Sequence, residues 1–256
     1  MVLFPPAKIN LGLYITGKRP DGYHNLETVF YPVLPLYDVL EAVPAADADN
    51  PTMHLSGLPV QGTLENNLVW KAYQLLQKKF PQIGPLDWHL HKAIPMGAGL
   101  GGGSSDGASA LLLLNKMFLL GLSVPELEAC ALQLGSDCPF FISAQPCFAG
   151  GRGGLLESIN VSLAGWRVEV IPSGIHVSTA AAFKLLTPRP APFDLRQLPA
   201  VTVEEWKEVL TNDFEAPVFS LHPELAQKKA ELYANSAAYV QMSGSGSALF
   251  AIYREA

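Results

Sequence analysis

The chain has 256 residues, 49% of them hydrophobic, and its 17 basic and 23 acidic residues give a net charge of −6. This length and composition can bury a sizeable core as one large domain or two smaller lobes. The acidic balance argues against nucleic acid or an anionic membrane as partner, because both select basic faces. A phosphorylated small molecule needs only a local site and remains open as a ligand.

The sequence favours a cytoplasmic protein. Its longest apolar runs, such as residues 111–114, are far shorter than the roughly 20 residues that cross a bilayer. The first residues, MVLFPPAKIN, lack a basic start and carry a Pro pair where a signal peptide would be apolar. Cys130, Cys138 and Cys147 form no CxxC pair and cannot all be paired with one another, which fits a reducing compartment.

Hydrophobic patterning and turn residues predict the elements of the first half. A strand is expected over 7–16, and a second long strand or a pair of strands over 26–43, broken at Pro32 and Pro35. A loop or edge hairpin is expected over 44–62. A helix is expected from Asn66, because an Asn stands at its start and apolar residues recur at helical spacing. This expected apolar face comprises Val69, Ala72, Tyr73 and Leu76.

Strands and helices also alternate in the second half. The expected elements are a helix over 124–134 ending at Gly135, a hairpin over 147–156, a strand over 166–171, a short helix capped by Ser178 or Thr179, a helix from the capping box Thr202-x-x-Glu205 through Leu210, a helix over 223–233, and strands over 238–242 and 248–253. This mixture predicts an α+β class with two lobes, divided into 1–155 and 156–256.

Residues 95–107, PMGAGLGGGSSDG, are the most informative segment. They hold six glycines between the strand-like DWHLHKAI and the apolar ASALLLLNKMF. Glycines permit positive φ and close approach of a ligand, and we expect Ser104, Ser105 and Asp106 to cap the helix that follows. A helix N-terminus offers free N–H groups and partial positive charge, so the segment predicts a phosphate-binding loop. It is neither a Walker A loop nor a dinucleotide fingerprint, and a flexible linker is the alternative.

Three further segments could contribute to a site. Lys8 and Asn10 alternate with apolar residues and so share one face of a strand, although a lone strand lysine usually points into solvent. Asp137 follows a predicted helix; it is either an ordinary turn residue or a proton acceptor for a hydroxyl. The SGSGS segment from Ser243 is either a plain hairpin turn or a second glycine loop over a nucleotide.

Together these segments resemble the GHMP kinases. PPAKINL, PMGAGLGGGSSD and MSGSGSALF match the three motifs of that family in order. The runs AKINLGLYITGKRPDGYHNLETVF and GSDCPFF, with the triple glycine of GLGGGSSD, are similar to the members that phosphorylate a cytidyl substrate. The resemblance covers nearly the whole chain. It implies a two-lobed α+β sandwich in which ATP and the substrate meet in the cleft between the lobes.

The resemblance implies a small-molecule kinase that phosphorylates the 2-hydroxyl of 4-diphosphocytidyl-2-C-methyl-D-erythritol with ATP. The products would be the 2-phosphate and ADP, in non-mevalonate (MEP pathway) isoprenoid precursor biosynthesis. Its catalytic residues fall on Lys8 and Asp137, with Asp137 as base and Lys8 as its electrostatic partner. The ATP phosphates would be bound by the glycine loop, which comprises Pro95, Met96, Gly97, Ala98, Gly99, Leu100, Gly101, Gly102, Gly103, Ser104 and Ser105.

The resemblance also implies the substrate-binding residues. Asn10 would contact the substrate near the transferred group. Tyr23 and His24 would recognise cytosine, with Phe183 as the second stacking aromatic and Thr179 as a polar neighbour. Without the resemblance, Tyr23 would be interpreted as a turn aromatic.

The remaining expectations concern the cofactor, the assembly and three further positions. Mg²⁺ is implied by ATP, with a hydroxyl of Ser104 or Ser105 as a candidate contact; the six histidines show no metal spacing, and the ligands stay unknown. The expected assembly is a monomer or weak homodimer. Lys92 and Asn67 are expected near the adenine or ribose, with a surface lysine and a helix cap as the alternatives. Position 107 is Gly where the family usually has Ala.

Three rival hypotheses remain at this point. The first is another GHMP enzyme, such as a homoserine, mevalonate or galactose kinase, which would lack the GYH cytosine reader. The second is a non-catalytic nucleotide-binding protein of the same fold, disfavoured because Lys8 and Asp137 are both present. The third is a structural or nucleic-acid-binding α+β domain, opposed by the acidic balance.

Overall fold

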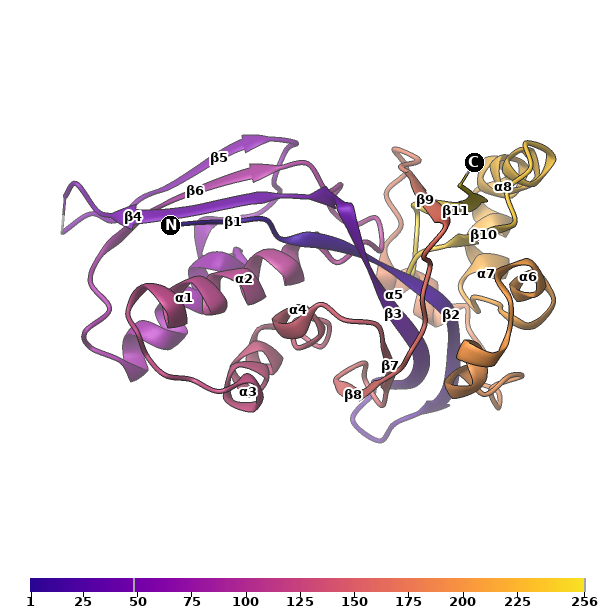
Figure 1. The fold of residues 1–256 in the computed structure, drawn as a ribbon, viewed down its shortest axis with the longest axis horizontal. Coiled ribbons are helices and arrows are strands. Elements are labelled where there is room, and N and C mark those ends of the chain that lie inside the picture. The colour runs from indigo at the N-terminus through magenta and orange to yellow at the C-terminus, as the bar shows by residue number, and fades with distance from the viewer. Residues whose placement is uncertain (48, 256) are drawn as a thin grey trace. The chain divides into compact units, whose positions relative to one another are not determined.

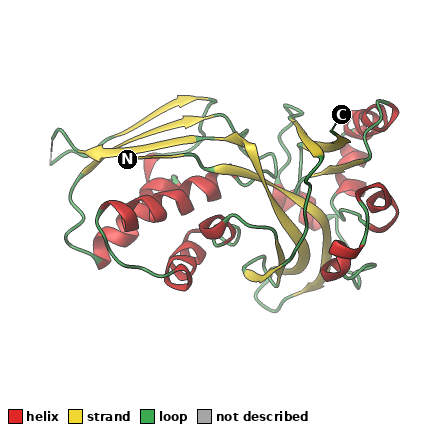
Figure 2. Cartoon of the chain, in the orientation of Figure 1, coloured by secondary structure: helices red, strands yellow, loops and turns green. Residues whose placement is uncertain are grey.

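The structure, a computed structural model, describes residues 1–47 and 49–255. Helices and strands are mixed along the chain, which confirms the predicted α+β class (Figure 1, Figure 2). The chain forms two compact units. Unit 1 comprises residues 1–7, 32–96 and 101–144, and unit 2 comprises residues 8–31, 97–100 and 145–256. Both units draw on separated stretches of sequence, and the family-domain division at 155/156 remains a prediction.

Unit 1 contains a four-stranded sheet and four α-helices. Its strands, in sheet order, are β1 (Val2–Leu3), β4 (Val39–Pro44), β6 (Leu86–Lys92) and β5 (Met53–Gly57). Its helices are the 3-10 turn η1 (Leu64–Asn66), α1 (Leu68–Lys79), α2 (Gly102–Met117), α3 (Val124–Leu134) and α4 (Phe140–Ser143). Helices α1 and α2 lie against one face of the sheet (Figure 1). Strand β6 alternates between buried residues such as Trp88 and exposed ones such as His89, as a one-sided sheet requires.

The start of α2 differs from the prediction. Gly101, not a serine or aspartate, is the N-cap residue, with φ of +72°. Ser104, Ser105 and Asp106 lie inside the first two turns, and the amide of Ser105 donates to the carbonyl of Gly101 at 2.9 Å. The helix starts earlier, at Gly102, where a glycine fits against Ile94, just after β6, and a side chain would collide. A Cβ on Gly102 would stand 2.9 Å from Cγ2 of Ile94.

Glycine at position 107 is explained by helix packing. A Cβ on Gly107 would lie 2.8 Å from Cβ of Leu68, the first residue of α1. Glycine favours the helix less than alanine would at this position, but it lets α1 and α2 approach more closely than alanine would allow.

Unit 2 contains two sheets and the remaining helices. One sheet has the order β2 (Pro6–Lys18), β3 (His24–Tyr37), β7 (Cys147–Gly150) and β8 (Leu155–Ser158), where the first two residues of β2 and the end of β3 belong to unit 1. The other has the order β10 (Tyr239–Met242), β11 (Leu249–Arg254) and β9 (Trp166–Ile171), all antiparallel. The helical elements are α5 (Thr179–Lys184), η2 (Leu195–Ala200), η3 (Val203–Glu205), α6 (Trp206–Val209), α7 (Glu215–Leu221) and α8 (Pro223–Ala234).

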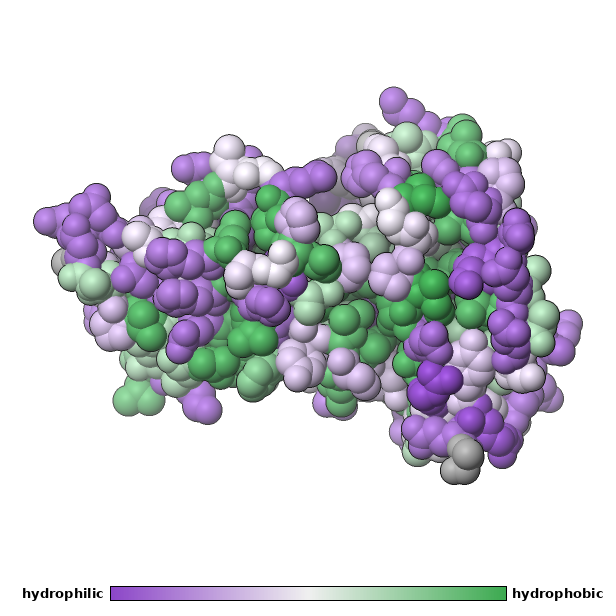
Figure 3. Space-filling view, turned by 90° about the horizontal axis from the view of Figure 1, so that it is seen from above, coloured by the Kyte–Doolittle hydropathy of each residue, from purple (hydrophilic) through white to green (hydrophobic). Residues whose placement is uncertain are grey.

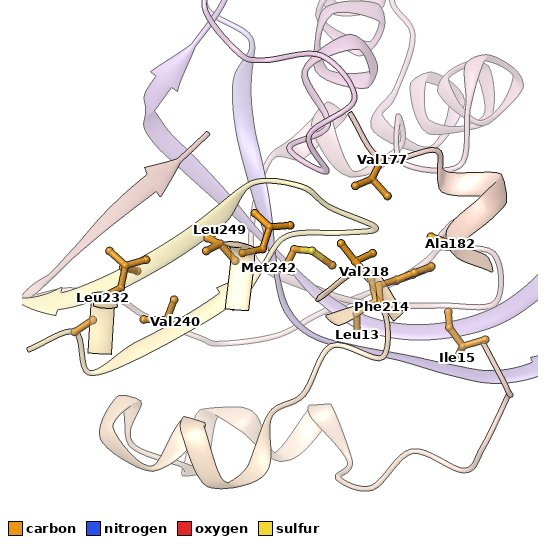
Figure 4. Packing of buried hydrophobic residues seen from close by; sticks show 13 residues of the cluster. Leu13, Ile15, Val177, Ala182, Phe214, Val218, Leu232, Val240, Met242 and Leu249 are labelled. Carbon is orange, nitrogen blue, oxygen red and sulfur yellow. The ribbon is translucent and has the colours of Figure 1, made fainter. Parts of the chain in front are cut away.

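A hydrophobic cluster holds the helices of unit 2 to its strands. Leu13 from β2 and Met242 from β10 gather with Phe214 and Val218 at the start of α7 (Figure 4). Each of these side chains is at most 4% exposed. Burying one such side chain contributes about 1.5–3 kcal/mol relative to leaving it in water.

Most predicted elements are confirmed, and the prolines of β3 are the clearest exception. The strand was expected to break at Pro32 and Pro35 but continues through both to Tyr37. Its pairing with β7 covers only Thr28 to Phe30, so neither proline needs to donate to that ladder. The loop or hairpin expected over 44–62 contains the edge strand β5, which pairs in parallel with β6.

On the face drawn in Figure 3, hydrophilic and hydrophobic residues are interspersed. Single exposed apolar side chains such as Leu34 and Leu119 are ordinary on a protein surface. Across the described residues, the structure contains no helix that is long and apolar enough to cross a membrane.

Candidate active site

The glycine loop connects β6 to α2 and adopts a conformation that depends on glycine. Gly97, Gly99 and Gly101 have φ of +66°, +79° and +72°, in the left-handed region that other residues rarely occupy. Any side chain on Gly99 would also collide with the carbonyl oxygen of Ser243. The loop is therefore a specific backbone shape and not a flexible linker.

The middle of the loop, residues 97–100, is fixed by hydrogen bonds within unit 2. The hydroxyl of Ser243 donates to the carbonyl of Gly99 at 2.8 Å, and the amide of Ala248 donates to the carbonyl of Ala98 at 3.2 Å. The SGSGS segment thus joins β10 to β11 and also packs on the glycine loop. The sequence alone left two interpretations of this segment open, a plain hairpin turn and a second glycine loop. In the structure the segment connects two strands and also contacts the glycine loop.

The N-terminus of α2 has the features of an anion site. No side chain caps it, and the first amide bonded along the helix is that of Ser105. The amides of Gly102, Gly103 and Ser104 precede that bond and carry the partial positive charge of the helix start. Backbone N–H groups arranged in this way bind phosphate.

Lys8 and Asn10 lie on one face of β2, as predicted, and form a buried polar chain in unit 2. The Lys8 ammonium donates to Oδ1 of Asn10 at 2.7 Å, and Nδ2 of Asn10 donates to Oγ1 of Thr28 at 2.9 Å. Thr28 in turn donates to the carbonyl of Gly12 at 2.6 Å. Lys8 is only 3% exposed and its ammonium lies 5.0 Å from the centre of the Phe30 ring, so it is not a solvent lysine.

Asp137 lies in unit 1, in the turn between α3 and α4. It is half-buried and accepts a 3.3 Å hydrogen bond from the hydroxyl of Ser136. The thiol of the next residue, Cys138, lies close to the hydroxyl of Ser104 in the first turn of α2. The turn that carries Asp137 therefore lies next to the first turn of α2. Burial raises the pKa of the Cys138 thiol to about 12, so the thiol is protonated near neutral pH.

The predicted cytosine readers belong to unit 2, and two of them touch. The rings of His24 and Phe183 are stacked, 4.9 Å apart and 18° from parallel. Tyr23 is 53% exposed, and the Arg152 guanidinium lies 3.5 Å from the centre of its ring. Thr179, on the same short helix as Phe183, lies 2.8 Å from the hydroxyl of Ser245.

Several contributing residues were not predicted. Thr28 lies in the quoted run of residues 7–30 but was not singled out, and Arg152 lies in no motif, because a strand threonine and a loop arginine are common surface residues. Lys92 was expected either near the nucleotide or on the surface. It is 2% exposed and its ammonium pairs with Asp38 and Asp106, so the surface alternative is wrong and the place near the nucleotide stays a prediction. Asn67 caps α1 by accepting from the amide of Val69 at 2.9 Å, which confirms the helix-cap alternative.

The described residues offer no cluster of three or more His, Cys, Asp or Glu that could hold a metal ion. The hydroxyl of Ser105 is buried without a hydrogen-bond partner, and Ser104 already contacts Cys138. This donor set suits a Mg²⁺ ion that depends on nucleotide phosphates and water, not a site built from protein carboxylates.

The comparison with known proteins agrees with the phosphate-binding loop and the candidate site described above. Residues 67–145 match the model of the GHMP kinases N terminal domain, and residues 197–256 match that of the GHMP kinases C terminal. The 4-diphosphocytidyl-2-C-methyl-D-erythritol kinase of Bacteroides thetaiotaomicron is 50% identical over 99% of this chain and 92% of its own length. The kinase of the same name from Chlorobium chlorochromatii is 41% identical over 96% of this chain and 86% of its own length.

Solved structures extend the comparison to the fold. A 4-(cytidine 5'-diphospho)-2C-methyl-D-erythritol kinase matches with a TM-score of 0.80 and 34% identity, covering 98% of this chain and 89% of the other. A homoserine kinase from Cytophaga hutchinsonii matches with a TM-score of 0.71 at 16% identity, over 100% of this chain and 85% of the other, and so shares the fold alone. By sequence and by fold, the chain belongs to the GHMP kinases, and within them to the 4-diphosphocytidyl-2-C-methyl-D-erythritol kinases.

Proposed function

We propose that this chain transfers the γ-phosphoryl group of ATP to the 2-hydroxyl of 4-diphosphocytidyl-2-C-methyl-D-erythritol, giving the 2-phosphate and ADP. One observation carries the proposal furthest. The uncapped N-terminus of α2 presents free amides, and the turn that carries Asp137 lies next to its first turn, where the Cys138 thiol approaches the Ser104 hydroxyl. A phosphate site next to a carboxylate is what transfer to an alcohol requires.

In this proposal the ATP phosphates bind along the glycine loop, residues 95–105. The amides at the start of α2 donate to phosphate oxygens, and the positive-φ glycines let the backbone approach them. A hydroxyl of Ser104 or Ser105 would contact the Mg²⁺ that accompanies ATP, and the ion would offset phosphate charge there.

The transfer itself needs positioning and electrostatics more than covalent chemistry. The oxygen of the substrate hydroxyl forms a bond to the γ-phosphorus. The bond from that phosphorus to the β,γ-bridging oxygen breaks, and its electron pair leaves with ADP. Asp137 accepts the hydroxyl proton, and Lys8 stabilises the negative charge of that carboxylate and of the transferring group. Asn10 orients the Lys8 ammonium through their 2.7 Å hydrogen bond and touches the substrate near the transferred group.

We assign recognition of the cytosine to Tyr23, His24 and Phe183, with Thr179 as a polar neighbour. Aromatic rings stack on a pyrimidine, and an imidazole can bond its polar edge. The contact of His24 with Phe183 supports a shared aromatic site, because it brings two distant segments together. A monomer or weak homodimer in the cytoplasm remains our expectation, which size-exclusion chromatography and fractionation can check.

The test is an assay that couples ADP formation to a measurable signal, on the purified chain. It compares 4-diphosphocytidyl-2-C-methyl-D-erythritol with homoserine, mevalonate and galactose. Turnover with the cytidyl compound alone is expected. Turnover with another alcohol would replace the proposed substrate, and ATP binding without any turnover would favour the non-catalytic alternative.

A further inference from the structure

Three charged side chains form a buried cluster next to the glycine loop, all of them in unit 1. Lys92, Asp38 and Asp106 have side chains that are 1%, 0% and 4% exposed. The Lys92 ammonium donates to Oδ2 of Asp38 and, at 2.6 Å, to Oδ2 of Asp106. Two carboxylates thus share one ammonium in a water-poor setting, and the reaction proposed above uses none of them.

The cluster connects the two ends of the glycine loop. Lys92 is the last residue of β6, directly before the loop, and Asp106 lies in the second turn of α2, directly after it. Their ion pair therefore ties the strand that leads into the loop to the helix that leaves it. A Cβ on Gly102 would lie 3.3 Å from the Lys92 ammonium, so a glycine at the helix start leaves room for this tie.

Asp38 adds a second tie to the backbone itself. Its Oδ1 accepts hydrogen bonds from the amides of Ala93 and Ile94, at 2.6 and 2.8 Å. Asp38 is itself anchored, since its amide donates to the carbonyl of Pro5 at 2.9 Å. One carboxylate thus holds both the ammonium of Lys92 and the two peptide groups that follow it.

Burying three charged groups costs desolvation free energy, so stability does not explain this cluster. Buried ion pairs are frequently no more stabilising than hydrophobic residues of similar volume. Here one oxygen of Asp106, Oδ1, is buried without a hydrogen-bond partner. What the cluster does supply is a fixed spacing between β6 and the start of α2, where the amides of Gly102 and Gly103 lie.

We propose that Asp38, Lys92 and Asp106 act as positioning residues that hold the two ends of the glycine loop in the conformation that binds the phosphates of ATP. This inference rests on the proposed function, because it takes the loop to be the phosphate site. It assigns to Lys92 a role through the backbone, not a direct contact with the nucleotide.

The central test is the double variant Lys92→Met, Asp106→Asn. It removes the tie between β6 and α2 and leaves Asp38 with its two amide donors, so no carboxylate loses every partner. The single variant Asp106→Asn keeps an oxygen that can accept from Lys92. Lys78→Met, at an exposed lysine of α1, is the matched control for loss of a lysine charge.

The readouts are the Kd for ATP by calorimetry, the KM values for both substrates, and the melting temperature without ligand. We expect the double variant to raise the Kd for ATP about tenfold or more, which corresponds to about 1.4 kcal/mol. The KM for the cytidyl substrate should change less than about twofold, since it does not depend on the tie. Lys78→Met should keep the Kd for ATP near that of the unmodified chain, and Asp106→Asn, which keeps one acceptor for Lys92, should raise this Kd less than the double variant does.

A folded double variant that binds ATP as tightly as the unmodified chain would overturn the inference, even if its melting temperature falls. Equal increases in both KM values would also overturn it, since they indicate a general structural defect. If the unmodified chain binds ATP but does not phosphorylate the cytidyl substrate, the substrate assignment fails while the Kd comparison still decides the role of the cluster. An unmodified chain that does not bind ATP would overturn both.

Discussion

The hydroxyl of Ser243 donates a 2.8 Å hydrogen bond to the carbonyl oxygen of Gly99, and this contact joins the β10–β11 connection to the glycine loop. The carbonyl of Ser243 lies so close to Gly99 that any Cβ there would collide with it. Gly99 also has φ of +79°. Two independent constraints therefore require glycine at this position.

Replacing Gly99 with alanine should impair both folding and ATP binding. We expect a lower melting temperature and a Kd for ATP raised at least about tenfold, because the loop must move away from Ser243. Gly165→Ala is the matched control: Gly165 has nearly the same φ, +78°, but no atom within 4 Å of its would-be Cβ. Equal losses of melting temperature in the two variants would mean that the backbone conformation alone matters and the contact does not.

Asp137→Asn should separate binding from turnover. The amide occupies the same volume but cannot accept the hydroxyl proton, so kcat should fall by about 100-fold or more while the Kd for ATP stays unchanged. Steady-state kinetics and calorimetry measure the two quantities. Asp49→Asn, at an exposed carboxylate of the same unit, should leave both unchanged. Turnover of the Asp137 variant within a few-fold of the unmodified chain would remove Asp137 from the role of base.

His24→Ala should act on one substrate only. Loss of the imidazole removes the ring stacked on Phe183 and a bonding partner for cytosine, so the KM for the cytidyl substrate should rise about tenfold or more. The KM for ATP should change little. His89→Ala, at an exposed position of β6, is the control. A similar rise in both KM values would show that cytosine is read elsewhere.

Asp106 should make stability depend on pH. Burial raises its pKa to about 7; the charge of Lys92 opposes this rise and that of Asp38 adds to it. The folded protein thus keeps a proton that the unfolded chain releases near pH 4. The contribution of Asp106 to the stability of the folded protein is therefore fully present below about pH 4 and is lost as the pH rises through about 7.

Urea denaturation at about pH 5 and about pH 8 measures this effect. As the pH rises from about 5 to about 8, the free energy of unfolding of the unmodified chain should decrease relative to that of the Asp106→Asn variant. The asparagine of this variant cannot titrate in that range. Parallel changes in the two proteins would show that Asp106 keeps an ordinary pKa.

Gly107→Ala should destabilise the protein although alanine favours helices. Alanine gains about 1 kcal/mol of helix propensity, but overpacking against Leu68 costs about 1–3 kcal/mol. Gly103→Ala, in the same helix, meets no atom within 4 Å and should keep or raise the melting temperature. Calorimetric melting of both variants checks this, and a gain in both would mean that α1 and α2 separate at little cost.

Much of the fold could be predicted because its signals are local. Apolar residues at helical spacing marked the buried face of α1, and all four predicted residues of that face are buried. The capping box at Thr202 and Glu205 and the N-cap Ser178 also formed as expected. The prediction was wrong at the start of α2, where Ile94 leaves room only for a glycine, and at the prolines of β3, which lie outside the pairing with β7.

The sequence by itself determined the class of the protein, most of its elements and the residue types of a phosphotransfer site. These properties follow from periodicity, turn chemistry and motifs, each contained within a short stretch of chain. Only the tertiary structure decided that Ser243 holds Gly99, that the turn carrying Asp137 lies next to the first turn of α2, and that Lys92 is shared by two buried carboxylates. Such contacts join segments far apart in sequence, and their energies depend on burial and geometry that no local pattern encodes.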